Sequence, residues 1–393
     1  MRHRTTQKST IPFWRDERIL NILGQVAFIF GVLFVGMLIF LNMRAGLAKQ
    51  GVTLSYNFFQ GIAGFGISET LFSYSRESSY WQAYLVGLLN TLSVSIVGVV
   101  FSTIFGVMLG VARLSTNFLI NRLATFYLEL IRNLSLLVFL IFWYQGVFLK
   151  LPRVKQAVLW PADIILTNRG VGIPWGLPTA SYPTFQLILL IGLILAIGVY
   201  LALRAYSRRT GRAPLTTLWT ILSFILVALI GWLLLPEKPL TLDLPFVKGL
   251  NLSGGKILSP EFMALTSGLV LYTSAFIGEV VRAGILSVSK GQVEASRALG
   301  LNGFQTLRLV VFPQALRVII PPLTSQYLNL IKNSSLAIAV GFPDVFYISN
   351  AIANQTGRAV EMIAMVMVTY LIFSLFTSVL MNWYNQRIKL VER

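Results

Sequence analysis

The chain has 393 residues, of which 55% are hydrophobic and 12% are charged, and its mean hydropathy is +0.73. That much apolar surface exceeds what one soluble core can bury, so the composition excludes a soluble globular protein and indicates a polytopic membrane protein. The formal net charge of +18 could suggest nucleic-acid binding, but the cations are dispersed between apolar runs; we therefore expect membrane lipid headgroups as the counter-charge and no nucleic-acid partner.

The first predicted element is an apolar run over Leu20–Met43. A helix needs about 20 apolar residues to cross the hydrocarbon core, and this run has enough. It is longer than the apolar stretch of about 7–15 residues in a cleaved signal peptide, so we expect it to remain as an anchor. We assign residues 1–83 to an N-terminal tail, this first transmembrane helix and an external segment.

Seven more runs along the chain are long enough to span the membrane. They are continuously apolar, unlike the alternating strands of an outer-membrane barrel, and therefore predict an all-α integral membrane protein with about eight transmembrane helices. Four of these runs carry no charge and three carry internal charges. The uncharged runs are Tyr84–Ala112, Pro183–Leu203, Ala213–Leu235 and Met362–Trp383, and the charged runs are Leu123–Leu149, Phe262–Leu286 and Val318–Val340.

These runs predict one membrane domain over residues 84–393, with an inserted segment at 150–260 that carries two extra helices. Within the insert, Leu252–Lys256 imitates nucleotide-binding motifs. A phosphate loop needs a glycine where Leu250 stands, and Ser or Thr where Ile257 stands. We therefore expect a glycine-rich external turn here, and no nucleotide site on this chain.

The distribution of Lys and Arg predicts the orientation, because these residues concentrate in cytoplasmic loops near helix ends. With the N-terminus inside, nineteen of the 32 Lys and Arg residues fall in inner segments and eleven in outer ones. Both termini and the loop at 291–313 are therefore expected to be cytoplasmic.

The loop at 291–313 is a polar, small-residue stretch between two apolar spans. Glu294 and Arg297 are one helical turn apart and can pair, and Gly300 permits the positive φ that ends a short helix. Pro313 can start the next helix, where its missing N–H costs little. The pattern predicts a short rigid docking helix. Its expected coupling residues are Gly291, Gln292, Glu294, Ala295, Ser296, Arg297, Gly300 and Pro313.

The spacing in this loop resembles the EAA loop in membrane subunits of bacterial ATP-binding-cassette (ABC) importers. The family pattern is Glu-Ala-Ala, three residues, Gly, nine residues and Ile-x-Leu-Pro. This chain has Glu294-Ala295-Ser296, Gly300 and Val310-Val311-Phe312-Pro313 at the same spacing. The resemblance implies a type I ABC importer permease fold with a cytoplasmic coupling helix.

Other segments resemble the polar-amino-acid branch of these permeases. They are Gly87–Leu92, Gly278–Ile285 and Ile331–Leu336. The long N-terminal part, with Gln60–Gly66, is similar to general L-amino-acid permease subunits. The resemblance therefore implies that amino acids are the substrate.

The resemblance also implies the assembly and location of the protein. It predicts a permease subunit of a binding-protein-dependent importer in the bacterial inner membrane. The implied partners are a homologous permease in a heterodimer, two ABC ATPase subunits that bind ATP and Mg, and an external substrate-binding protein. This chain would hold no cofactor and would not be an enzyme.

Charges inside the membrane are costly and often face a cavity or a counter-charge. Arg132 could pair with Glu129, one turn away, or could meet the carboxylate of a transported amino acid, as could Lys332. Segment 132–135 lacks the Gly and Pro of the family motif, which weighs against a kink in this span. The candidate pathway residues are Arg132, Lys332, Asn90, Ser334 and Ser335, and Glu279 and Arg282 are expected to support the base of the loop.

Two other classes of function remain as alternatives. An ion-coupled secondary amino-acid transporter would need no ATPase, but the sequence shows no convincing internal repeat. A membrane-embedded enzyme is disfavoured because cysteine is absent and His3 is the only histidine. A histidine or thiolate metal site and a Ser-His-Asp triad therefore lack their residues, and we expect neither catalytic nor metal-binding residues.

Overall fold

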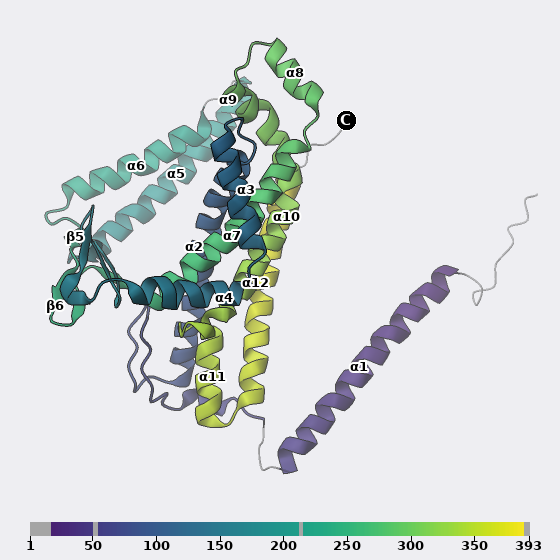
Figure 1. Cartoon of the computed structure of the whole chain (residues 1–393), viewed down its shortest axis with the longest axis vertical. Coiled ribbons are helices and arrows are strands. Elements are labelled where there is room, and N and C mark those ends of the chain that lie inside the picture. Colours follow the sequence, from purple (N-terminus) through teal and green to yellow (C-terminus); the bar gives the residue numbers. More distant parts are fainter. Residues whose placement is uncertain (1–16, 50–53, 212–214, 389–393) are drawn as a thin grey trace, which may run out of the picture.

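A computed structural model describes residues 17–49, 54–211 and 215–388, and helices dominate the architecture (Figure 1). In these ranges seven helices are long and apolar enough to cross a membrane, or eight if one bent pair counts as a span. The expected number of about eight is thus confirmed. The long helices are α1 (Glu17–Lys49), α2 (Tyr80–Ala112), α5 (Tyr182–Thr210), α6 (Thr216–Leu234), α7 (Pro260–Leu286), α10 (Phe312–Asn333) and α12 (Ala359–Ile388).

Helices α2 and α7 form the centre of the bundle, and small residues let their backbones approach closely. A Cβ atom added at Gly106 would lie 2.4 Å from Cγ2 of Ile277. One added at Gly110 would lie 2.7 Å from the carbonyl oxygen of Gly278. Small residues favour such close contact between membrane helices, where packing replaces the hydrophobic effect as the driving force.

The span predicted over Leu123–Leu149 is not one helix. Helix α3 (Phe118–Arg132) ends at Arg132, and the chain then turns by 107°. It continues as α4 (Leu136–Ile141), the π-helix η3 (Phe142–Val147) and the 3-10 helix η4 (Phe148–Lys150). The Asn133 side chain donates to the carbonyl of Glu129 and its N–H bonds to Leu130. Because such residues compete for backbone bonds, they can end a helix without Gly or Pro.

The inserted segment contains short β-strands that the sequence analysis did not predict. Strands β1, β2, β3 and β8 form one antiparallel sheet in that order, while β4 pairs with β5 and β6 with β7. The expected glycine turn is present, since Gly254 and Gly255 have φ of +73° and +57° between β7 and β8. The strands are β1 (Val158–Trp160), β2 (Ile164–Thr167), β3 (Gly170–Ile173), β4 (Trp175–Pro178), β5 (Leu240–Asp243), β6 (Phe246–Lys248), β7 (Asn251–Ser253) and β8 (Lys256–Leu258); η5 (Val154–Gln156) precedes them.

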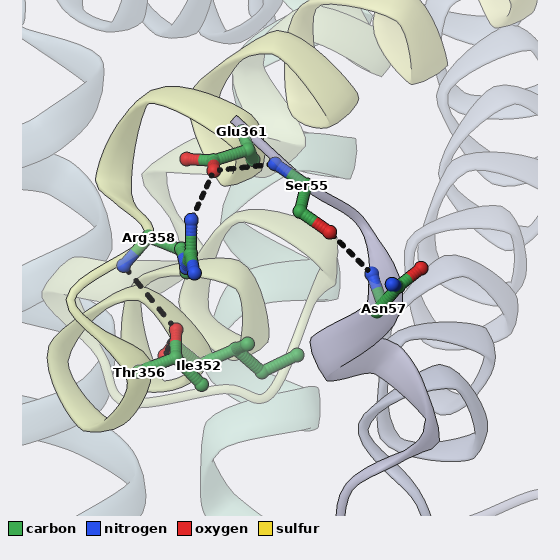
Figure 2. A network of polar contacts seen from close by, with 6 residues as sticks. All are labelled: Ser55, Asn57, Ile352, Thr356, Arg358 and Glu361. Atoms are coloured by element: carbon green, nitrogen blue, oxygen red, sulfur yellow. Dashed lines mark hydrogen bonds and ion pairs between the residues drawn. The ribbon is translucent and has the colours of Figure 1, made fainter. Parts of the chain in front are cut away.

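The segment that precedes α2 is anchored to the turn between α11 (Val345–Thr356) and α12 (Figure 2). The backbone N–H of Ser55 donates to Glu361 Oε1 at 3.3 Å, and Arg358 pairs with the same oxygen at 3.2 Å. Glu361 is only 2% exposed. A buried carboxylate needs such partners, so this cluster fixes the segment before α2, including η2 (Asn57–Gln60), to the bundle.

The two ends of the bundle differ in structure. Figure 1 shows the short helices α8 (Lys290–Ala298) and α9 (Gly303–Thr306) at one end and α11 at the opposite end, with α12 running between them. Near the first end, the π-helix η6 (Leu307–Val311) leads directly into α10. The 3-10 helix η7 (Ser334–Ala339) leads from α10 toward α11. The chain therefore runs from α8 and α9, at one end of the bundle, through η6 directly into α10.

Candidate functional site

The loop at 291–313 forms the short helix that its sequence predicts. Helix α8 covers Lys290–Ala298, and the chain reverses at Gly300, where φ is +82°. A residue with a side chain would be strained in this conformation, which explains the glycine. Pro313 occupies the first turn of α10, as expected. The coupling role of these residues stays a prediction.

A buried pair of hydroxyl groups joins α8 to α9. Ser296 and Thr306 are 3% and 4% exposed, and a hydrogen bond of 3.1 Å joins Ser296 Oγ to Thr306 Oγ1. Asn302 and Gln305 form a capping box that defines the start of α9. Helix α8 is therefore attached to the segment that continues into α10, rather than hanging from a free loop.

The outward face of this loop is exposed and partly apolar. Leu299 and Phe304 are 82% and 70% exposed and flank the reversal of the chain. Both were missed in the sequence analysis, although apolar residues in a polar loop are a recognisable signal. The spacing of Glu294 and Arg297 allows an ion pair, but none joins them in the structure. Both side chains are exposed, where a pair gains little over hydration. Gly291, Gln292 and Ala295 are also exposed.

The base of the loop contains a charge cluster. Glu279 of α7 pairs with Arg282, with Oε1 and Nη1 3.0 Å apart, and also with Arg113 at the end of α2. The role of Glu279 and Arg282 in supporting the base of the loop stays a prediction. Arg113 was missed, although it follows an apolar run and lies on the same predicted side of the membrane. The cluster joins the end of α2 to α7, the helix that leads into the loop.

A polar cavity of about 370 Å³ lies between α7 and α10, and we call it the central pocket. Tyr272, Thr273 and Phe276 line it from α7, and Gln326, Asn329 and Asn333 line it from α10. The last three fall at i, i+3 and i+7, so helical periodicity places them on one face. That spacing could have identified Gln326 and Asn329 from the sequence.

Arg132 approaches a residue that lines the central pocket, and Lys332 is next in sequence to Asn333, which also lines it. The guanidinium of Arg132 lies 5.8 Å from the ring centroid of Phe276, which lines that pocket. The expected pair with Glu129 is wrong, because the end of α3 carries Arg132 toward α7 instead. Lys332 is exposed and forms no ion pair within the described residues.

None of the five candidate pathway residues lines the central pocket. Asn90 is buried, and its amide donates to the carbonyls of Glu69 at 3.0 Å and Pro343 at 2.9 Å. The hydroxyls of Ser334 and Ser335, in η7, donate to the carbonyls of Ile331 and Lys332 in the last turn of α10. Their polar atoms are therefore already bonded within the chain.

Comparison with known proteins agrees with this architecture. Residues 98–390 match the family described as "Binding-protein-dependent transport system inner membrane component". The chain is 42% identical to the "General L-amino acid transport system permease protein AapQ" of Rhizobium johnstonii, over 96% of this chain and 92% of that protein. It is 42% identical to the "Putative amino-acid ABC transporter permease protein YhdX" of Escherichia coli, over 99% of each.

A third relative also extends over nearly the whole chain. It is the "Glutamate/glutamine/aspartate/asparagine transport system permease protein BztB" of Rhodobacter capsulatus, which is 38% identical over 96% of both proteins. The similarity thus includes the external segment and the insert as well as the helical bundle.

Proposed function

This chain belongs to the family of binding-protein-dependent transport system inner membrane components, and from that premise we propose that it carries amino acids into the cytoplasm as one permease subunit of an ABC importer. The names of three relatives, similar over nearly their full length, support an amino-acid cargo. The observation that carries the mechanism is that α8 is attached to the bundle through buried Ser296, while Leu299, which follows its last residue, is exposed.

The proposed docking surface for an ATPase subunit is the exposed face of α8 and α9. Leu299 and Phe304 would enter apolar recesses of the ATPase, and Glu294 and Arg297 would make polar contacts at the rim. Gly291, Ala295 and Gly300 are small and would let the partner approach closely, and the exposed Gln292 would make a further polar contact. ATP and Mg would be bound by the ATPase subunits, with this chain supplying no cofactor site.

The proposed transmission path starts at α8 and divides at its anchors. One branch passes through Ser296 and Thr306 into η6 and α10. The other passes into α7, where Glu279 and Arg282 support the base of the loop and Arg113 extends the contact to α2. Since α7 and α10 line the central pocket, displacement of α8 would alter that pocket.

The proposed pathway lies at the central pocket, against a second, homologous permease. Arg132 and Lys332 are exposed in the single chain, and a charge facing lipid is costly. A second permease, in a heterodimer, would cover them and complete the passage. The α-carboxylate of a passing amino acid would then meet Arg132 or Lys332, while Asn90, Ser334 and Ser335 hold the helices around it.

We place the protein in the bacterial inner membrane with both termini cytoplasmic, which puts α8 on the side where ATP is available. The support is the excess of Lys and Arg in the segments on that side. An external substrate-binding protein would deliver the amino acid at the opposite end of the bundle.

Reconstitution tests this function directly. The chain would be purified with its ATPase, its partner permease and its binding protein, placed in liposomes, and assayed for uptake of radiolabelled L-amino acids. We expect uptake that requires ATP and the binding protein. Uptake by this chain alone, driven by an ion gradient, would contradict the proposal and support the secondary transporter.

A further inference from the structure

A second cavity lies at the external side of the bundle, and we call it the outer pocket. Its volume is about 350 Å³, within the range of small-molecule sites. Three parts of the chain form its walls: the segment before α2, the β-structure of the insert, and the helical bundle. Among its lining residues are Glu69, Asn90, Trp175, Lys256, Phe262 and Phe342.

The carboxylate of Glu69 is held in a fixed position within this pocket. Its Oε1 accepts a hydrogen bond of 2.8 Å from the backbone N–H of Ser259, the N-cap of α7. The Glu69 carbonyl accepts from the Asn90 amide at 3.0 Å, which ties the same residue to α2. Burial raises the pKa of the Glu69 carboxyl above its usual value, although the bonds from Ser259 oppose this effect. A cationic ligand would offset the cost of that burial.

The ammonium group of Lys256 is also held by its surroundings. Its Nζ lies 4.9 Å from the ring centroid of Trp175. The backbone before it is fixed, because the N–H of Gly255 donates to Asp243 Oδ2 at 2.7 Å. No ion pair joins Lys256 to Glu69 in the structure. The pocket therefore presents one anion and one cation that do not neutralise each other directly.

We propose that the outer pocket is a receiving site for a free zwitterionic amino acid, whose α-ammonium binds Glu69 and whose α-carboxylate binds Lys256. The aromatic walls Trp175 and Phe262 then contact the amino-acid side chain. This inference rests on the proposed importer function and adds a binding step on this chain before the central pocket. The separate charges of Glu69 and Lys256 fit a ligand that carries one positive and one negative group. A ligand that lacks one of these groups would leave either Glu69 or Lys256 without a partner.

The proposal predicts how binding depends on the two ligand charges. The assay uses the complete complex of both permeases and the ATPase subunits in lipid nanodiscs, without the binding protein, and measures equilibrium binding of L-alanine. Alaninamide, which lacks the carboxylate, and propionate, which lacks the ammonium, are the comparison ligands. We expect L-alanine to bind at least tenfold more tightly than either.

Substitutions then locate the site. Glu69→Gln, which keeps an acceptor for Ser259, and Lys256→Gln are each expected to weaken L-alanine binding at least tenfold, whereas Lys256→Arg keeps it within threefold. Lys248→Gln, at an exposed lysine of β6 that does not line the pocket, is the matched control and should change binding less than twofold. Size-exclusion profiles and thermal unfolding identify any variant that fails to fold.

Three results would overturn the proposal. They are unchanged binding in Glu69→Gln and Lys256→Gln, the absence of L-alanine binding to the wild type up to millimolar concentration, and binding that Asn329→Leu in the central pocket abolishes while Glu69→Gln does not. ATP-driven uptake by the wild-type complex with its binding protein is measured in parallel. If uptake is present, these results reject the outer pocket alone, whereas loss of both uptake and binding rejects the importer function too.

Discussion

The hydroxyl groups of Ser296 and Thr306 are joined by a hydrogen bond of 3.1 Å, and both side chains are buried although most of the surrounding loop is exposed. This pair connects the helix that we propose as the ATPase contact to the segment that becomes α10. In the proposed mechanism, movement of α8 would be transmitted through this packed contact rather than through a flexible linker.

The first prediction concerns this pair. Replacing Thr306 with Val keeps the shape of the side chain but removes this hydrogen bond. Ser296 keeps its bond to the Val293 carbonyl, so the loss is about 0.5–1.5 kcal/mol. We expect α8 to bind the ATPase still, but to transmit its movement poorly, so that fewer amino acids are transported per ATP hydrolysed. Ser223→Ala removes a local hydroxyl bond in α6 and serves as the control. If Thr306→Val transports as many amino acids per ATP hydrolysed as the wild type does, this role is contradicted.

The second prediction concerns the contact between α2 and α7. Gly106→Ala places a Cβ atom 2.4 Å from Ile277 and 3.2 Å from the Ser274 carbonyl, so the helices must separate. We expect a loss of about 1–3 kcal/mol in stability and a lower midpoint of thermal unfolding in detergent. Gly198→Ala in α5 is the matched control, because no atom lies within 4 Å of its added Cβ. Equal midpoints for the two variants would refute the close-packing account.

The third prediction concerns the cluster around Glu361 (Figure 2). Glu361→Gln keeps an acceptor for the Ser55 N–H but removes the charge that pairs with Arg358. Because this carboxylate is buried, breaking its charge pair should loosen the segment before α2. Faster proteolytic cleavage within residues 54–79 is the expected result. Glu129→Gln, at an exposed carboxylate without an ion pair in the structure, should not change the cleavage rate.

The fourth prediction concerns the central pocket. Asn329→Leu replaces a polar lining group with an apolar one of similar size. We expect the maximal rate of amino-acid uptake to fall at least fivefold while association with the ATPase subunits stays unchanged. Asn251→Leu, at an exposed residue of β7, is the control. Full uptake by Asn329→Leu would show that cargo does not pass this surface.

The sequence predicted the helical membrane fold and its family because both depend on long apolar runs and on the spacing from Glu294 to Pro313. Hydropathy could not predict the turn after Arg132, since it results from hydrogen bonds made by Asn133. It also missed the strands of the insert, which have only three or four residues each and depend on pairing between distant segments such as β3 and β8.

The candidate site was predicted unevenly for a similar reason. Helix α8 was predicted because its signals are local in sequence, and it is present. The pairing of Glu129 with Arg132 was wrong because a tertiary contact with Phe276 replaces the local one. Arg113 meets Glu279 only after α2 has packed on α7, so no short-range pattern identifies that pair.

The central claim is that an ATPase subunit binds the exposed surface at the end of α8. The affinity of the purified permease complex for its ATPase tests this claim most directly. Burial of a leucine contributes about 1.5–3 kcal/mol, so Leu299→Asp should weaken binding at least tenfold. Leu250→Asp, at a leucine that is 62% exposed in the insert, should leave the affinity unchanged. Wild-type affinity in the double variant Leu299→Asp with Phe304→Asp would contradict the account.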